Sequence, residues 1–155
     1  MRILMSSLGC LLVWWIIGCG SGQDELVNFV DQIVLLQEYN QTLSQYLHRF
    51  ETNPQDPGEA NQVGNVLDAY HRAMSRIPPT RDILIKSLHG QYIQAIEKAQ
   101  KRIKPLDDPM FTLEARRAIM GLRSDVEELY ETLGLVLLRE NLSERYTLEW
   151  PTTEE

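Results

Sequence analysis

The stretch DELVNFVDQIVLLQEYNQTLSQYLHRFET, residues 24–52, decides the fold of this chain. Its apolar residues recur in alternating steps of three and four, which places them along one face of an α-helix. Asp24 and Glu25 put negative charge where the positive end of a helix dipole favours it. At 1.5 Å per residue the predicted helix is roughly 43 Å long. The positions on its apolar face form a heptad seam: Leu26, Phe29, Ile33, Leu36, Asn40, Leu43, Leu47 and Phe50.

Asn40 is the polar member of this seam. A polar residue at such a position can fix the register or the choice of partner helix. More often it lies at a solvated edge, and we expect that for Asn40.

The prolines of the remaining chain are confined to short clusters, at positions 54 and 57, 78 and 79, 105 and 109, and 151. Because proline breaks helix interiors, the clusters separate four proline-free segments. These predict helices over 24–52, 59–76, 80–103 and 109–141, of which the second is the shortest. Thr80 is the expected N-cap of the third helix. Asp108 is the expected cap of the fourth, with Pro109 at its first position.

The other three segments have apolar seams of the same period. Their members are Val63, Val66 or Leu67, Tyr70, Met74 and Ile77; Ile85, Leu88, Tyr92, Ala95, Ile96 and Ala99; and Ala115, Ile119, Leu122, Val126, Leu129, Leu133 and Val136. No strand-like alternation of useful length is present. The sequence predicts an all-α fold, an antiparallel bundle of about four helices over residues 24–146: two long, one medium and one short. A three-helix bundle with a short packed helix is the alternative. Residues 147–155 are predicted to form an irregular acidic tail.

The beginning of the chain has a different character. Arg2 is the single charge before an apolar run over residues 3–17, and Gly18, Cys19 and a Gly-Ser-Gly stretch follow. This is the pattern of an export signal. Two alternatives remain open. An uncleaved transmembrane anchor would need roughly twenty apolar residues, and ordinary secretion would use the small residues around Gly18 for cleavage.

The four residues Ile16-Ile17-Gly18-Cys19 resemble the lipobox of bacterial lipoproteins, and the resemblance covers only the first nineteen residues. It implies a signal peptide over 1–18, cleavage after Gly18, lipid on Cys19 and a short tether over 19–23. It also implies a protein anchored in the cell envelope on the non-cytoplasmic side. Gly20 in place of an aspartate after the cysteine favours the outer membrane. Two or three acyl chains would hold such a protein firmly.

Composition limits what a domain after this signal can do. Beyond Cys19 there is no cysteine, so stability has to come from the hydrophobic core without a disulfide. Without Arg2, 14 basic residues face 22 acidic ones, a net charge of −8. This charge disfavours a nucleic-acid partner and bare anionic lipid. The basic cluster Lys98, Lys101, Arg102 and Lys104 lies near a helix C-terminus, where cations are favoured anyway.

The residues that could do chemistry form no strong motif. His48, His71 and His89 fall on three helices, beside the apolar seams rather than on them. Di-iron bundles need two Glu-x-x-His pairs, and Asp68 with His71 is the one near match. There is no Gly-x-Ser-x-Gly, phosphate loop or His-Glu-x-x-His. The acidic run Asp125, Glu127, Glu128 and Glu131 is expected to be a solvated face. We therefore expect no enzyme, and no catalytic, cofactor or metal residues.

Two functions fit these observations. The first is a lipid-anchored, non-catalytic interaction, adaptor or structural protein of the cell envelope, held to the membrane through Cys19 and able to bind an envelope protein. The second is a ligand- or metal-binding helical bundle in the periplasm, with its site near His71 or in the gap left by a short second helix. A partner helix would need apolar residues outside the seams. The candidates, which could instead widen the core face, are Val27, Val34, Leu35, Ile93 and Leu138.

Overall fold

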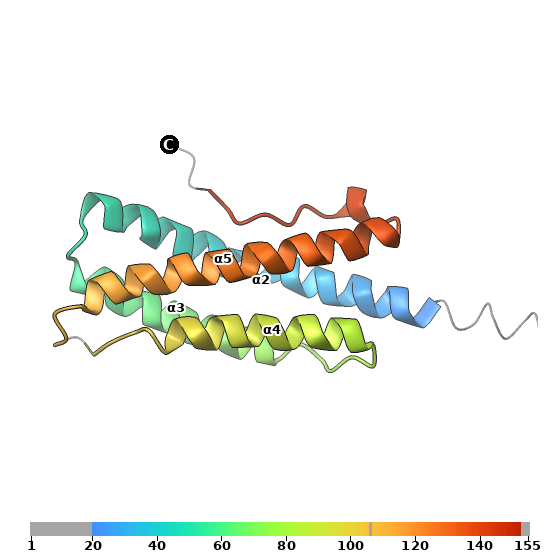
Figure 1. Ribbon diagram of the computed structural model, residues 1–155, viewed down its shortest axis with the longest axis horizontal. Coiled ribbons are helices and arrows are strands. Elements are labelled where there is room, and N and C mark those ends of the chain that lie inside the picture. Colours follow the sequence, from blue (N-terminus) through green and yellow to red (C-terminus); the bar gives the residue numbers. More distant parts are fainter. Residues whose placement is uncertain (1–19, 106, 153–155) are drawn as a thin grey trace, which may run out of the picture.

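The structure, a computed structural model, describes residues 20–105 and 107–152. It contains four helices: α2 (Gly20–Thr52), α3 (Pro57–Ser75), α4 (Ile83–Gln100) and α5 (Phe111–Arg139). A single 3-10 turn, η1 (Ser143–Arg145), follows α5. The helices run alternately in opposite directions, so α2 begins at the end of the bundle where α5 finishes (Figure 1). No strand occurs within these two ranges. The prediction of an all-α antiparallel bundle is confirmed.

Consecutive helices are neighbours, and α5 closes the bundle by contacting α2 as well as α3. The long helices α2 and α5 span 33 and 29 residues, as expected. The other two differ from expectation, because α3 has 19 residues and α4 has 18. The second helix is therefore not the shortest, and no gap arises from a truncated α3.

The start of α4 explains part of its shortness; the helix also ends at Gln100, before the expected Ile103. The N-cap is Asp82, whose carboxylate accepts hydrogen bonds from the backbone N–H of Leu84 at 2.8 Å and Ile85 at 3.0 Å. The prediction that Thr80 caps this helix is wrong, because its hydroxyl is hydrogen-bonded to the Glu25 carboxylate of α2. The residues before Asp82 thus form a connection that is tied to the first helix.

The start of α5 is also later than predicted. Asp108 does not cap the helix: its carboxylate accepts from the backbone N–H of Met110 at 2.8 Å and stabilises a turn that precedes Phe111. Phe111 is buried in the core. Since burial of a phenylalanine stabilises by about 1.5–3 kcal/mol, its packing favours a helix that begins at this residue rather than at Pro109.

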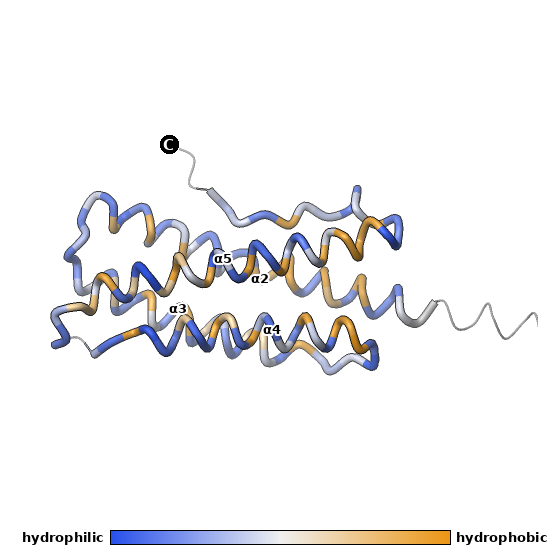
Figure 2. Tube along the Cα trace, in the orientation of Figure 1, coloured by the Kyte–Doolittle hydropathy of each residue, from blue (hydrophilic) through white to orange (hydrophobic). Residues whose placement is uncertain are grey.

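The four predicted seams form one continuous core. Orange and blue alternate along every helix of the tube in Figure 2, as expected for amphipathic helices around a shared interior. All seam members are buried except four that are partly buried and pack against the core: Leu36, Leu47, Val66 and Val136. Val30, Ala118, Tyr130 and Leu137 are buried too, although they lie outside the predicted seams.

The chain after η1 turns back along the bundle, beside α5 (Figure 1). Residues 147–152 contain neither helix nor strand, yet they are docked. The Tyr146 hydroxyl donates to the Asp31 carboxylate of α2 at 2.7 Å, and Gln37 of α2 donates to the Thr147 carbonyl at 3.4 Å. The Trp150 side chain is only 5% exposed. Residues 147–152 therefore form an extended segment that is docked on the domain.

Candidate functional site

The predicted lipid attachment residue, Cys19, lies outside the described residues. Helix α2 begins at the next residue, Gly20. Residues 20–23, which were predicted to belong to a short tether, are helical and form the first described turn of α2. From Gly20 the backbone continues without interruption into the buried residues Leu26 and Phe29.

We define the proximal end of the bundle as the first turns of α2, the connection 76–82, the first turn of α4 and the last two turns of α5. The Glu25 carboxylate holds the first two of these together. One of its oxygens accepts from the Thr80 hydroxyl and from the backbone N–H groups of Arg81 at 3.0 Å and Asp82 at 3.1 Å. The hydrogen bond from Thr80, followed by that from Asp82, lowers the pKa of the Glu25 carboxyl below its usual value.

The surface of the proximal end includes large apolar side chains that are exposed. Ile83, the first residue of α4, is 85% exposed, and Leu135 and Leu138 on α5 are 70% and 61% exposed. Leu84 lines a hollow of about 130 Å³ that also includes Gly22 of α2 and Arg139 of α5. Three helices therefore meet here, as expected for the end of an antiparallel bundle.

A larger hollow of about 310 Å³, the proline pocket, lies between α2 and the α3–α4 connection. Apolar lining comes from Phe29, Ile77, Pro78, Pro79 and Ile85, and polar lining from Glu25, Asn28, Gln32, Thr80 and His89. His89 is already engaged, since its Nε2 lies 2.9 Å from the Met74 carbonyl and its ring meets Phe29 edge-on. The pocket is suited to an apolar group.

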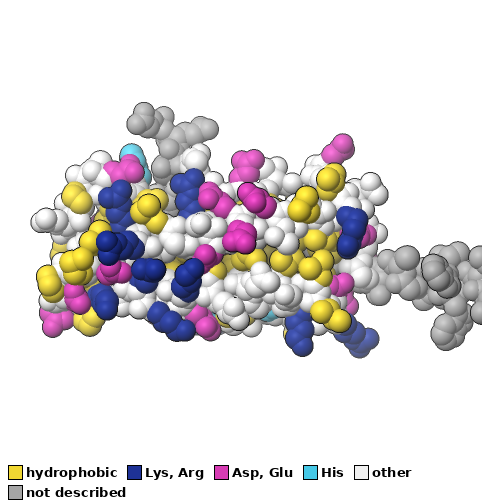
Figure 3. Space-filling model, in the orientation of Figure 1, with side chains coloured by type: hydrophobic (Ala, Val, Ile, Leu, Met, Phe, Trp, Pro, Cys, Tyr) yellow, Lys and Arg dark blue, Asp and Glu magenta, His cyan; other side chains and the backbone are white. Residues whose placement is uncertain are grey.

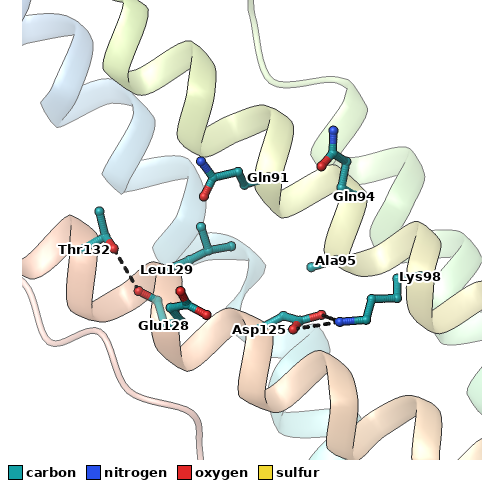
Figure 4. A pocket seen from close by; sticks show the side chains of 8 residues that line it. All are labelled: Gln91, Gln94, Ala95, Lys98, Asp125, Glu128, Leu129 and Thr132. Carbon is teal, nitrogen blue, oxygen red and sulfur yellow. Dashed lines mark hydrogen bonds and ion pairs between the residues drawn. The ribbon is translucent and has the colours of Figure 1, made fainter.

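The groove between α4 and α5 is polar (Figure 4). It has a volume of about 260 Å³, and Gln91, Gln94, Glu128 and Thr132 are among its lining residues. Lys98 of α4 forms an ion pair with Asp125 of α5 at 2.8 Å. Because this pair neutralises Asp125, the groove does not place two free carboxylates together for acid–base catalysis.

The rest of the predicted acidic face is solvated. Glu127 pairs with Arg123 at 2.8 Å along the same helix, and Glu131 is exposed. Exposed pairs of this kind contribute little to stability, about 0–1 kcal/mol. This part of α5 is a surface of ordinary charged residues, as predicted.

The three histidines have three separate environments. His48 is exposed and lies 3.5 Å from Glu51, His71 lies 3.4 Å from Glu97, and His89 binds the Met74 carbonyl. The distance between His71 and Glu97 is short enough for an ion pair, but the Nε2 atom of His71 has no well-aligned hydrogen bond. Across residues 20–105 and 107–152, no three His, Cys, Asp or Glu side chains cluster closely enough to hold a metal ion.

The Asp-x-x-His pair on α3 does not form a half-site. Asp68 instead accepts a hydrogen bond from Gln100 of α4 at 2.7 Å. The carboxylate therefore links two helices at the surface, and the di-iron pattern has no structural counterpart in the described part of the chain.

A buried polar cluster at the centre of the bundle was missed by the sequence analysis. Each helix contributes one residue to it: Asn40, Tyr70, Tyr92 and Tyr130. The Tyr70 hydroxyl donates to Tyr92 at 3.0 Å, Tyr92 donates to Tyr130 at 3.1 Å, and the Asn40 amide donates to Tyr130 at 2.9 Å. The expectation that Asn40 lies at a solvated edge is wrong, since its side chain is fully buried.

Burial sets the ionisation of these tyrosines. It raises the pKa of Tyr70 and of Tyr92 far above the usual value, and raises that of Tyr130 less strongly. All three phenols are therefore neutral at physiological pH. Together with Asn40 they join all four helices through hydrogen bonds in the core.

The apolar residues proposed for partner binding divide into two groups. Leu35 and Leu138 are exposed, and Val34 is marginally so. Val27 and Ile93 are half-buried, and Ile93 packs against the core. The alternative that these residues widen the core face is therefore correct for Ile93 and wrong for Leu35 and Leu138.

Comparisons with known proteins found no matching family model, no matching curated protein and no matching solved structure. Among the helices that the structure describes, none has the length and apolar character needed to cross a bilayer.

Proposed function

We propose that this chain is a lipid-anchored, non-catalytic helical protein of the cell envelope, acting as an interaction, adaptor or structural lipoprotein. The feature that supports the proposal best is the lipobox-like sequence directly before the bundle. The chain is already helical at Gly20, the first described residue, and α2 enters the core within two turns.

This continuity has a mechanical consequence. A flexible linker would let a domain move freely above the membrane. Here the residue after Cys19 is already helical, and Glu25 attaches the second turn of that helix to the α3–α4 connection. Lipid on Cys19 would therefore hold the whole bundle by its proximal end, with the connections at its opposite end directed away from the bilayer.

The arrangement of polar residues supports a non-catalytic role. In the described residues, the hydrophilic groove between α4 and α5 has its cation and one carboxylate joined in an ion pair. The buried tyrosine hydroxyls bind one another in the core. Neither place offers a substrate a nucleophile next to a base, which acyl or phosphoryl transfer would require.

Metabolic labelling with radioactive palmitate tests the proposal. The parent chain is expected to incorporate label and to remain with the membrane fraction, and Cys19→Ala is expected to abolish both. Cys10→Ala is the matched control, because Cys10 lies within the predicted signal and should leave labelling unchanged. Unlabelled parent protein, or label that persists in Cys19→Ala, would contradict the lipid anchor.

The proline pocket supports a second candidate function, the binding of a small apolar ligand. Its volume of about 310 Å³ lies at the lower end of the range for ligand sites. Native mass spectrometry of protein purified from the envelope tests it. A mass in excess of the acylated chain that disappears in Ile77→Trp, which fills the pocket, would support ligand binding, and the absence of such a mass would argue against it.

A further inference from the structure

The exposed apolar side chains of the proximal end have no partner within the bundle. They come from the first turn of α4 and the last turns of α5: Ile83, Leu84, Leu135 and Leu138. The surrounding sides of the molecule are mixed and largely polar. In Figure 3, hydrophobic, basic and acidic side chains lie next to one another at this end of the visible face.

The charges of this end differ from those of the whole chain. The net charge of the chain is −7, but the segment from residue 76 to residue 86 contains three cations, Arg76, Arg81 and Lys86. No carboxylate oxygen of the described residues lies within 4.0 Å of a side-chain nitrogen of any of the three, although the Glu25 carboxylate binds the backbone N–H of Arg81. The single acid in the segment, Asp82, caps α4 through two backbone N–H groups. The segment therefore offers cations without a side-chain ion pair beside exposed leucine and isoleucine, while the acids Asp24 and Glu25 of α2 belong to the same end.

The end of the bundle at which the N-terminal segment joins α2 indicates which partner covers this surface. Helix α2 begins at the proximal end, and the apolar run of residues 3–17 precedes it in the sequence. Lipid on Cys19 would therefore bring this end, and not the opposite one, against the headgroups. Surfaces that combine cations with protruding apolar residues bind the interface of anionic bilayers, with the apolar groups about 5–10 Å deep.

We propose that the proximal end is a membrane-contact surface, in which Ile83, Leu84, Leu135 and Leu138 enter the lipid interface and Arg76, Arg81 and Lys86 bind anionic phospholipid headgroups. This inference rests on the proposed function, because the lipid on Cys19 brings the surface to the bilayer. It adds that the bundle has a fixed orientation, with α4 and α5 contacting the membrane beside the anchor.

Fluorescence quenching by brominated lipids tests the contact. The acylated full-length product is reconstituted into phosphatidylglycerol–phosphatidylethanolamine vesicles with bromine on the acyl chains. A tryptophan introduced as Ile83→Trp is expected to lose at least half of its emission. Leu113→Trp is the matched control at the opposite end of the bundle, where the parent leucine is also exposed, and it is expected to lose none.

A second probe and a charge variant make the test specific. Leu138→Trp is expected to be quenched as Ile83→Trp is, and both variants should keep the parent's helical circular dichroism because the replaced side chains are exposed. Replacing Arg76, Arg81 and Lys86 together by glutamine is expected to reduce the quenching of Ile83→Trp at least twofold. Equal quenching with and without the three cations would overturn their proposed role in headgroup binding.

Flotation of the same vesicles separates this inference from the proposed function. Acylated protein that floats with the vesicles while Ile83→Trp and Leu138→Trp are quenched no more than Leu113→Trp would overturn the contact surface and leave the anchor in place. This lack of additional quenching is expected if an envelope protein, instead of lipid, covers these residues. Protein that carries no acyl group and does not float would overturn the proposed function itself, and the contact surface with it.

Discussion

The Tyr92 hydroxyl lies between two other buried hydroxyls, and its removal tests the centre of the bundle. It accepts a hydrogen bond from Tyr70 and donates one to Tyr130. Tyr92→Phe removes one oxygen atom and leaves the ring and its packing in place. The change therefore isolates the polar contacts from the hydrophobic ones.

The expected cost follows from the number of hydrogen bonds lost. A buried hydrogen bond contributes about 0.5–1.5 kcal/mol net, and Tyr92→Phe removes two, so the free energy of unfolding should fall by about 2 kcal/mol. Tyr70→Phe removes one and should cost about 1 kcal/mol. The double variant should cost about 2 kcal/mol rather than 3, because both single variants remove the same Tyr70–Tyr92 bond.

Urea denaturation of a chain that begins at Gly20, and so retains every described residue, provides the measurement. For a domain of this size a loss of about 2 kcal/mol should shift the midpoint by roughly 1 M. Tyr39→Phe is the matched control. Tyr39 stacks on Tyr70 with ring centroids 4.9 Å apart, but its hydroxyl makes no hydrogen bond with the described residues. Its removal should change stability by less than about 0.5 kcal/mol.

Two results would refute this reasoning. If Tyr92→Phe were no more destabilising than Tyr39→Phe, the hydroxyls of the core would not be bonded as described. If the costs of Tyr70→Phe and Tyr92→Phe simply added, the two residues would not share a hydrogen bond.

Three further predictions concern the tail, the core tyrosines and Glu25. Trp150→Ala should lower the free energy of unfolding by about 3 kcal/mol because the indole is buried; unchanged urea denaturation would mean that the tail is not docked. Burial raises the pKa of all three core tyrosines, so the stability that they provide is complete below pH about 10 and is lost as the pH rises further. Absorbance at 295 nm should therefore show the ionisation of these three tyrosines only when the protein unfolds. Ionisation of all six tyrosines of the chain in the folded state would disprove this prediction. Glu25→Gln should speed hydrogen exchange at the two backbone amides that bind the carboxylate. Because these contacts lower the pKa of Glu25, the same acceleration should occur in the parent as the pH falls below the usual carboxyl range, and pH-independent protection would contradict it.

The fold was predictable because the spacing of apolar residues in each helical segment identifies the face that the helix buries. The three-four spacing of residues such as Ile33, Leu67, Ile96 and Ile119 identified the core, and all four are fully buried. Such spacing depends on the geometry of one helix alone. It needs no knowledge of the neighbouring helices.

Features that depend on contacts between distant segments were not predictable in the same way. Thr80 and Asp82 are both good capping residues, and the choice between them is made by Glu25, 55 residues before Thr80. Asn40 is buried because Tyr130, 90 residues later, lies opposite and offers a partner. The sequence around a polar seam residue does not reveal which residues of the other helices lie opposite it.

The candidate site was predictable only in part. The lipobox-like sequence predicts Cys19 as the lipid attachment residue, but the proximal surface depends on where α4 begins and α5 ends. Leu138 was among the residues considered for partner contacts, whereas Ile83 and Leu135 were not. Ile83 is exposed because the helix starts after Asp82, which places the residue at the tip of the bundle.

The central claim is that lipid on Cys19 holds the helical bundle to a membrane. Intact mass spectrometry of the protein extracted from its native membranes tests this claim most directly. We expect a chain that begins at Cys19 and carries two or three acyl groups. An unmodified chain that still begins at Met1, or one cleaved elsewhere without lipid, would contradict it.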